Sequence, residues 1–475
     1  CFGAAVESNE SQRGTLPGEE FRAAFLGDRL LPYQELMRLC LDEGGMEEAL
    51  RWAERARARA LTDAIDSGEP VDDSADPVRR EVAQLRLELD DCYRELARPT
   101  AQAEGATQLL ARVRRIEAAL LEAGRRSAAS AVQQPWAHAA VGLDFAALHD
   151  ALGDHSALVE YFSLDGVLHA FVVADGRVTH QRLAARHDDA RERIAQLRFQ
   201  TDTLRHSTAR LGHRLAELRA RALHHLQALH AQLWAPLLPR LAAKRAVIVP
   251  HGALHYLPFE ALHDGQQHEV ERREMCRSPS AAVLLHVLTR PRRRFKSALV
   301  LGHADARLPQ VQVEAEAVAA RFPGARALLG DAASSTALRS GDAGTDVVHI
   351  ACHAQFRNDS PRFSALYLAD GALTVRDAAR LALPCGLVTL SACETGINAV
   401  LPGDELIGLT SAFLSAGAAR VLASLWTVHD DVAAGFMANF YDRLRAGAEP
   451  AAALRATQLD ALRTHAHPYF WSAFV

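Results

Sequence analysis

The sequence predicts an α/β protein in which a parallel sheet is covered by helices on both faces and is preceded by an α-helical segment. From residue 297 onward, short apolar runs alternate with amphipathic segments, the pattern of parallel strands joined by helical crossovers. The first third of the chain instead repeats apolar residues every three or four positions, as helices do. The 475 residues are 49% hydrophobic and 23% charged, which is typical of a globular protein, and this length corresponds to about three domains.

Charge and composition exclude several functional classes. The formal net charge is −5, so the chain lacks the basic excess of a dedicated nucleic-acid binder. No run of about 18 apolar residues is free of charge, so we expect no membrane contact. The 7 cysteines are widely spaced without a CxxC pair, which favours a reducing, cytoplasmic compartment over a disulfide framework. Residue 1 is Cys, and we expect it to mark a boundary inside a longer chain.

Residues 33–66 have the features of two short helices separated by a break at Gly44-Gly45. Two helices around a small-residue turn, with alanines where they pack closely, are what a tetratricopeptide-type repeat requires. One such unit cannot bury its own apolar face, so we expect earlier repeats to precede Cys1. A further helix is predicted over residues 78–96, and residues 124–135 have the composition of a linker.

The middle of the chain begins with a predicted β-hairpin. The runs 158–162 and 168–173 are apolar and flank Asp165-Gly166, a dipeptide that favours a tight hairpin turn. A long helical stretch follows over residues 188–238, and a buried strand over 246–250. The helical stretch contains five histidines that suit a solvated helix face better than a metal cluster, because their spacings do not place ligands on one side: His206, His213, His224, His225 and His230.

The last third predicts a regular series of strands and helices. The expected strands are residues 298–302, 326–329, 346–351, 387–391 and 420–425. The expected helices are residues 313–322, 375–381, 404–416, 430–446 and 451–465.

Two of these strands end in residues that can carry chemistry. The strand before His353 and the strand before Cys393 are separated by enough chain for one crossover helix, so the two can be neighbours in the sheet. A histidine and a cysteine at adjacent strand ends supply a general base and a nucleophile for acyl transfer. The turn after Cys393 also offers backbone N–H groups to a developing oxyanion.

Other interpretations of these residues stay open on spacing alone. Buried cysteines are common in apolar strands, and a strand-end histidine can be purely structural. Cys352 is a rival nucleophile, although it adjoins His353 and should point to the opposite face of the strand. A zinc site built on His349, His353 and a cysteine lacks an obvious fourth ligand. The chain has no GxSxG, GxGxxG, Walker A or HExxH motif, so we expect no cofactor and no metal.

At these residues the sequence resembles a known family, the CHAT domain, a bacterial caspase-like domain attached to tetratricopeptide repeats. The resemblance is carried by HIACHA at 349–354 and LSACETG at 390–396. Further short segments match in order along the chain: VPHGALHYLPFEAL at 249–262, PS at 279–280, FSAL at 363–366, PGDE at 402–405, ASLW at 423–426 and HPYFW at 467–471. Residues 47–64 also resemble the last repeat and connecting helix of such proteins.

The resemblance implies a cysteine endopeptidase of the caspase and separase clan, with a caspase-like sandwich fold. The catalytic histidine falls on His353, the nucleophile on Cys393, and the oxyanion-holding N–H groups near Ala354 and Cys393. Residues from about 158 to 286 would form a catalytically silent half. The family usually has glycine after the histidine, so Ala354 would be strained if that position required a positive φ.

The resemblance and the pattern together predict four parts of the chain: a partial repeat at 1–66, a helical connector at 67–144, a silent caspase-like half at 145–290 and a catalytic half at 291–475. Asp359, Asp404 and Glu405 lie in predicted loops near the site and are candidates for substrate binding, with a structural role as the alternative.

We expect a protein substrate and a regulatory protein partner that docks on the helical repeats, and the resemblance implies a bacterial defence or cell-death system. Nucleic acid would act only indirectly. The alternative function is a catalytically degenerate scaffold that binds proteins.

Overall fold

The computed structural model describes most of the chain. The residues outside the description are 15–24, 26–28, 58–60, 63–64, 66–80, 82–83, 86–87, 90, 93–107, 110, 117, 120–121, 124–142, 208–213, 292, 305–309, 341–343, 358–360, 393–394, 402–403 and 429. Most of the predicted helix at 78–96, the predicted linker at 124–135 and much of the predicted connector therefore lie outside the described residues.

Three helices form the described part of the N-terminal segment: α1 (Phe2–Gly14), α3 (Leu31–Asp42) and α4 (Met46–Arg55). Gly44 has a φ of 80°, a conformation that glycine adopts without strain, and it ends α3 so that α4 can turn back against it. The predicted helix break at this position is confirmed. Ala49 and Ala53 of α4 are buried, and their small side chains allow α4 to lie close to the apolar residues within 158–173 and 247–249.

The first sheet has the strand order β3-β2-β1-β4-β5. Its strands are β1 (Ser156–Leu164), β2 (Val167–Ala174), β3 (Arg177–Arg186), β4 (Arg245–Val249) and β5 (Glu274–Arg277). Asp165 and Gly166 both have positive φ, 52° and 73°, so the predicted hairpin turn between β1 and β2 is confirmed. Strands β3 and β5 were not anticipated from the sequence.

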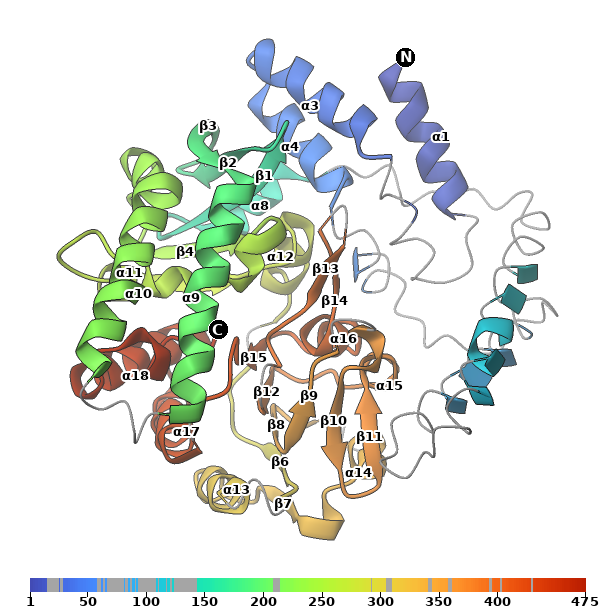
Figure 1. Cartoon of the computed structure of the whole chain (residues 1–475), viewed down its shortest axis with the longest axis vertical. Helices are drawn as coiled ribbons and strands as arrows, with labels where there is room; N and C mark the ends of the chain where they lie inside the picture. The colour runs from blue at the N-terminus through green and yellow to red at the C-terminus, as the bar shows by residue number, and fades with distance from the viewer. Residues whose placement is uncertain are drawn as a thin grey trace.

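Both faces of the first sheet are buried, because side chains along β1 alternate between two apolar clusters. Val159 and Tyr161 point to the cluster that includes the helical turn η2 (His230–Trp234). Leu158 and Phe162 point to the opposite cluster. That second cluster contains residues of α4 and of two further helices, α8 (Phe145–Leu152) and α12 (Ala281–Leu288). Helices α3 and α4 are therefore docked on the first sheet at one end of the molecule, and α1 packs against α3 (Figure 1).

The second sheet is entirely parallel, as predicted, with the order β15-β12-β8-β6-β7. Its strands are β6 (Ala298–Gly302), β7 (Arg326–Leu329), β8 (Val347–Ala351), β12 (Leu387–Ser391) and β15 (Val421–Ala423). Helices α13 (Val311–Ala319), α17 (Asp430–Arg445) and α18 (Pro450–Thr464) cover one face, and α15 (Val375–Ala379) and α16 (Leu409–Ser415) cover the other. The two sheets come from the third and fourth predicted parts of the chain, whose boundaries stay predictions.

The predicted helix at 404–416 is wrong over its first residues. Glu405–Ile407 forms strand β14, which pairs with β13 (Ala399–Leu401) in an antiparallel hairpin, and α16 begins only at Leu409. Pairing with the preceding strand outweighs the local helix propensity of these residues. A three-stranded sheet that was also missed contains β9 (His353–Gln355), β10 (Ala365–Leu368) and β11 (Gly371–Thr374).

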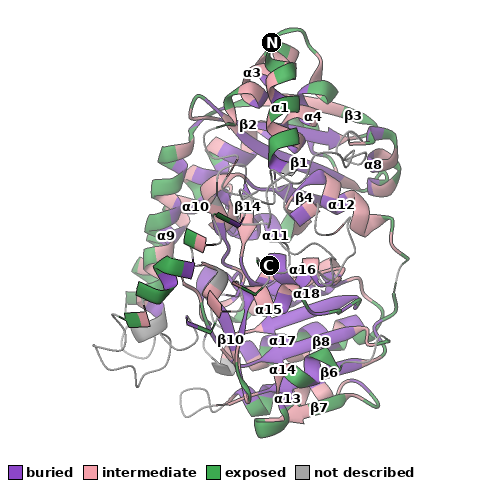
Figure 2. Ribbon diagram, turned by 90° about the vertical axis from the view of Figure 1, so that its right-hand side faces the viewer, coloured by how far each residue is buried: buried purple, intermediate pink, exposed green. Residues whose placement is uncertain are grey.

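Two segments join the sheets to each other. Helix α9 (His187–Ser207) runs alongside both of them, with Leu197 packed beside Trp471 and Leu204 in the core of the second sheet (Figures 1 and 2). The C-terminal residue also lies between the sheets: Val475 exchanges two backbone hydrogen bonds with Ala423 of β15. Among the residues described here, no helix is both long and apolar enough to cross a membrane.

Truncating Ile350 should destabilise the second sheet. Ile350 lies on the central strand β8 and is 0% exposed, so Ile350→Ala should lower the free energy of unfolding by about 2–5 kcal/mol. Val313 on α13 is 53% exposed, and Val313→Ala should change it by less than about 0.5 kcal/mol. Urea unfolding followed by circular dichroism measures both variants. Equal effects would contradict the central place of β8 in the core.

Candidate active site

The two strands that precede the predicted catalytic residues are neighbours. Strands β8 and β12 pair in parallel, and Ala351 is the ladder partner of Ser391. Ala351 lies two residues before His353, and Ser391 lies two residues before Cys393. The register therefore brings both strand ends to the same edge of the sheet, where neighbouring strands are about 4.8 Å apart.

His353 is the first residue of β9, and it is only partly buried. Its backbone is paired with that of Tyr367 on β10. The two rings also stack, with centroids 5.6 Å apart and planes inclined by 29°. The hydroxyl of Tyr367 donates a hydrogen bond of 2.8 Å to Oε1 of Gln355. These contacts restrict the orientation of the His353 ring.

Ala354 is unstrained in this structure. It lies within β9 and is paired with Leu366, and among the described non-glycine residues only Asp165, Asp175 and Asp404 have positive φ. The replacement of the usual glycine by alanine thus causes no backbone strain here. Cys352, the rival nucleophile, is 1% exposed and belongs to the apolar cluster beneath the strand ends. Its burial disfavours a nucleophilic role.

Cys393, Glu394 and Asp359 lie outside the described residues, as does the side chain of Glu405. The chain on either side of positions 393–394 is held by hydrogen bonds. The hydroxyl of Ser424 donates to the carbonyl of Ala392 at 2.8 Å, and the N–H of Gly396 donates to the carbonyl of Ser424 at 2.8 Å. A Cβ at Gly396 would lie 2.9 Å from that carbonyl oxygen, so this close approach requires glycine.

Asp404 is buried, and its carboxylate contacts residues of the first half of the chain. Its Oδ2 lies 2.6 Å from Nδ1 of His251, and its Oδ1 accepts a 2.8 Å hydrogen bond from the N–H of Gly252. Nη2 of Arg57 lies 3.2 Å from the same Oδ2. With a φ of 49°, Asp404 also adopts a turn conformation that Asp tolerates better than most residues. The structure therefore gives this carboxylate internal partners.

Arg57 and its neighbours form a buried charged cluster that sequence reasoning missed. Arg57 is 3% exposed, and its Nε lies 3.5 Å from Oε1 of the fully buried Glu160. Glu54, one turn earlier, accepts hydrogen bonds of 2.9 Å from the N–H groups of Ala281 and Ala282 at the start of α12. The available signal was the arginine and glutamate spacing within the repeat-like segment, which identifies no partner by itself.

Burial and neighbouring charges shift the pKa values in this cluster. Burial opposes ionisation of Asp404, but His251 and Arg57 outweigh it and hold its pKa well below its ordinary value. Burial, reinforced by Glu54, raises the pKa of Glu160 well above its ordinary value despite the opposing effect of Arg57. Burial also lowers the pKa of His255 to about 3. Asp404 is therefore the carboxylate that carries the negative charge opposite Arg57.

The zinc alternative has no support in the described residues. His349 is fully buried; its Nδ1 lies 3.1 Å from the hydroxyl of Tyr441, and its Nε2 lies 3.2 Å from Oε1 of Glu314. That hydroxyl donates in turn to Thr389 at 2.7 Å. Both ring nitrogens of His349 thus face protein partners, and the described residues include no group of three or more metal ligands.

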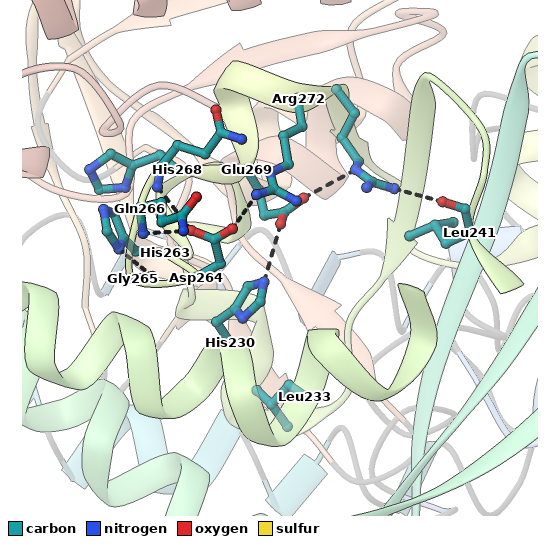
Figure 3. Close-up of polar contacts among 12 residues, drawn as sticks. His230, Leu233, Leu241, His263, Asp264, Gly265, Gln266, His268, Glu269 and Arg272 are labelled. Atoms are coloured by element: carbon teal, nitrogen blue, oxygen red, sulfur yellow. Dashed lines mark hydrogen bonds and ion pairs between the residues drawn. The ribbon is translucent and has the colours of Figure 1, made fainter. Parts of the chain in front are cut away.

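A second polar cluster lies in the first half, between η2 and α11 (Glu269–Arg272). Nε2 of His230 lies 3.2 Å from Oε1 of Glu269, and the two side chains point toward each other (Figure 3). Nε of Arg273 lies 3.1 Å from the other oxygen of Glu269. His230 is 5% exposed, so its predicted place on a solvated helix face is wrong: the chain after α10 (Leu215–Leu229) turns it inward. His224 is exposed as predicted, and position 213 and the side chain of His206 lie outside the described residues.

Comparisons with known proteins agree with this architecture. Two crystal structures of the Saccharomyces cerevisiae separase–securin complex align with a TM-score of 0.50 each, at 10% and 11% sequence identity. Each alignment covers 96% of this chain and 43% or 42% of the solved chain. At such low identity the likeness shows the fold alone. The chain therefore has an α/β fold similar to that of the separase chain, preceded by a helical segment.

Sequence comparison identifies the family. The family model of the CHAT domain matches residues 223–475, and the chain belongs to this family. Tetratricopeptide repeat protein 28 of Homo sapiens is 36% identical over 105 residues, and that of Mus musculus is 35% identical over 104 residues. Each match covers 22% of this chain and 4% of the relative, so the chain spans a small part of the length of these relatives.

The raised pKa of Glu160 predicts a pH-dependent effect of Glu160→Gln. Folded Glu160 retains a proton above the ordinary pKa of about 4.3, whereas the unfolded chain releases it. The free energy of unfolding of the wild type therefore falls with rising pH in that range, by up to about 1.4 kcal/mol per pH unit. Glutamine holds no such proton. The melting temperature of Glu160→Gln should therefore rise relative to wild type between pH 5 and pH 8.

The control is Glu48→Gln on the exposed surface of α4, whose difference from wild type should stay constant over the same range. Calorimetry at three pH values measures all three proteins. A Glu160→Gln difference that does not change with pH would contradict a raised pKa for Glu160.

Proposed function

We propose that this chain is a cysteine endopeptidase that cleaves protein substrates through His353 and Cys393. The observation that carries the proposal is the register of β8 and β12, which pairs Ala351 with Ser391 and so aligns the two segments leading to the histidine and the cysteine. Membership in the CHAT family and the caspase-like fold support it. A catalytic role for a strand-end residue also agrees with the placement of active sites in open α/β sheets.

The proposed mechanism is acyl transfer to sulfur. The His353 imidazole takes the proton from Cys393, and the thiolate attacks the peptide carbonyl. The N–H groups of Ala354 and Cys393 stabilise the oxyanion, and His353 then returns the proton to the leaving amine. Water hydrolyses the thioester. The ring of Tyr367, stacked on His353, keeps the base oriented between the two half-reactions.

The acidic residues have different proposed roles. Asp359 and Glu405 remain candidates for substrate binding. For Asp404 we favour the structural role, because its carboxylate is buried and already faces Arg57, His251 and Gly252.

The proposed partners are a protein substrate and a regulatory protein that docks on the N-terminal helices. Stacked helical repeats offer concave surfaces for such docking. The similar proteins include a tetratricopeptide repeat protein and a separase–securin complex, which agrees with regulation by protein contacts. A role in bacterial defence or cell death, in a reducing cytoplasm, completes the proposal.

Replacing Cys393 tests the nucleophile. Cys393→Ala should abolish cleavage of a peptide library, and His353→Gln should reduce it by about 100- to 10,000-fold, since general-base assistance is lost. The matched control is Cys352→Ala, which removes the rival thiol and should retain cleavage. Mass spectrometry of new peptide termini measures the rates. Cleavage that survives in Cys393→Ala, or is lost in Cys352→Ala with the fold intact, would contradict the assignment.

The alternative is a degenerate scaffold that binds proteins without cleaving them. Iodoacetamide distinguishes the two functions. A nucleophile activated by His353 should be alkylated at Cys393 well below the ordinary thiol pKa of about 8.5, and His353→Gln should shift this reaction to higher pH. A scaffold cysteine should show the same pH profile in both proteins.

A further inference from the structure

We propose that Arg57 is a positioning residue for the active site: through Asp404 it couples the N-terminal helices to the segment that follows Cys393. This inference rests on the proposed function, and it assigns a regulatory route to the same site. Its basis is a single buried contact between two parts of the chain that lie 347 positions apart in the sequence.

The guanidinium of Arg57 contacts several elements at once. Nη1 donates to the carbonyl of Pro250 at 2.5 Å, and Nη2 donates to the carbonyl of Tyr161. Nη2 also lies 3.2 Å from Oδ2 of Asp404. A planar guanidinium can satisfy these acceptors together, whereas a lysine ammonium cannot reach them in one conformation. Arg57 is therefore bound to the first sheet and to the catalytic half simultaneously.

Asp404 connects this contact to the catalytic segment. It lies between β13 and β14, the hairpin that joins the chain after Cys393 to α16. The same hairpin has a second attachment, because the hydroxyl of Tyr256 donates to the carbonyl of Asn398 at 2.7 Å. Tyr256 also lies against Arg198 of α9, with the guanidinium 5.0 Å from the ring centroid. These contacts hold Asn398 and Asp404 against the first half of the molecule.

The other end of the coupling is the N-terminal helices. Arg57 follows α4 directly, and Glu54 fastens the last turn of α4 to the start of α12. Helix α4 also contacts α1 through Arg55, whose guanidinium makes two hydrogen bonds to Glu10, of 3.1 and 2.7 Å. A protein that binds α1 or α3 and shifts α4 would move Arg57 and thereby change how firmly Asp404 holds the hairpin. Such a partner changes the site by binding more tightly to the protein with α4 shifted than to the protein with α4 in its present position.

Arg57→Lys tests the coupling, and Arg55→Lys is the matched control. Both positions carry an arginine that pairs with a carboxylate, and both variants keep the positive charge, but only Arg57 touches Asp404. Arg57→Lys should lower kcat for peptide cleavage at least 10-fold with less than a threefold change in KM, and it should accelerate hydrogen exchange in the peptide covering residues 395–408. Arg55→Lys should leave both readouts within twofold of wild type.

Asp404→Asn is a second variant, needed if Arg57→Lys folds poorly. It keeps the size of the side chain and removes the charge that faces Arg57. Like Arg57→Lys, Asp404→Asn should lower kcat and accelerate hydrogen exchange in residues 395–408. The double variant should be no worse than the more impaired single variant, because both substitutions break the same contact. Additive losses in the double variant would count against a shared route.

The results separate this inference from the proposed function. If Arg57→Lys and Arg55→Lys match each other in kcat and in exchange, the coupling is refuted even though cleavage depends on Cys393. If the wild type shows no Cys393-dependent cleavage but Arg57→Lys still accelerates exchange in residues 395–408, the coupling stands and the peptidase proposal fails. Unchanged exchange in an inactive protein refutes both.

Discussion

The parallel ladder between β8 and β12 determines the rest of the site. Because the two strands are in register from Val347 and Leu387 to Ala351 and Ser391, their carboxyl ends emerge at one edge of the sheet. Apolar side chains bury both faces of this sheet, and a shift of one residue would place its core side chains on the wrong face. The register is thus strongly specified, and the position of His353 follows from it.

A second constraint is electrostatic. Glu160 and Asp404 both face Arg57 in a buried region, where an unpaired charge is costly. One guanidinium faces two carboxylates, and the raised pKa of Glu160 relieves this imbalance. Asp404 stays ionised because His251 and Arg57 face it. The resulting contacts link α4, the first sheet and the β13–β14 hairpin. These polar contacts fix how the first sheet and the hairpin lie against each other.

Local sequence patterns predicted the elements that are regular over several residues. The hairpin at Asp165-Gly166, the break at Gly44-Gly45 and the five parallel strands follow from turn chemistry and apolar runs. Prediction failed where a distant segment decides the conformation. The residues of β14 look helical until they pair with β13, and His230 looks solvated until η2 turns it toward Glu269.

The sequence by itself determined the fold class and the family to which the chain belongs, and it indicated that the strands before His353 and Cys393 can be neighbours. These depend on short-range patterns and on motifs that remain visible in one dimension. Only the tertiary structure decided the partners of Arg57 and Asp404, because a contact across 347 positions leaves no periodic signal. It also showed that Ala354 lies in a strand without strain, since a residue's φ depends on its neighbours in space as well as on its type.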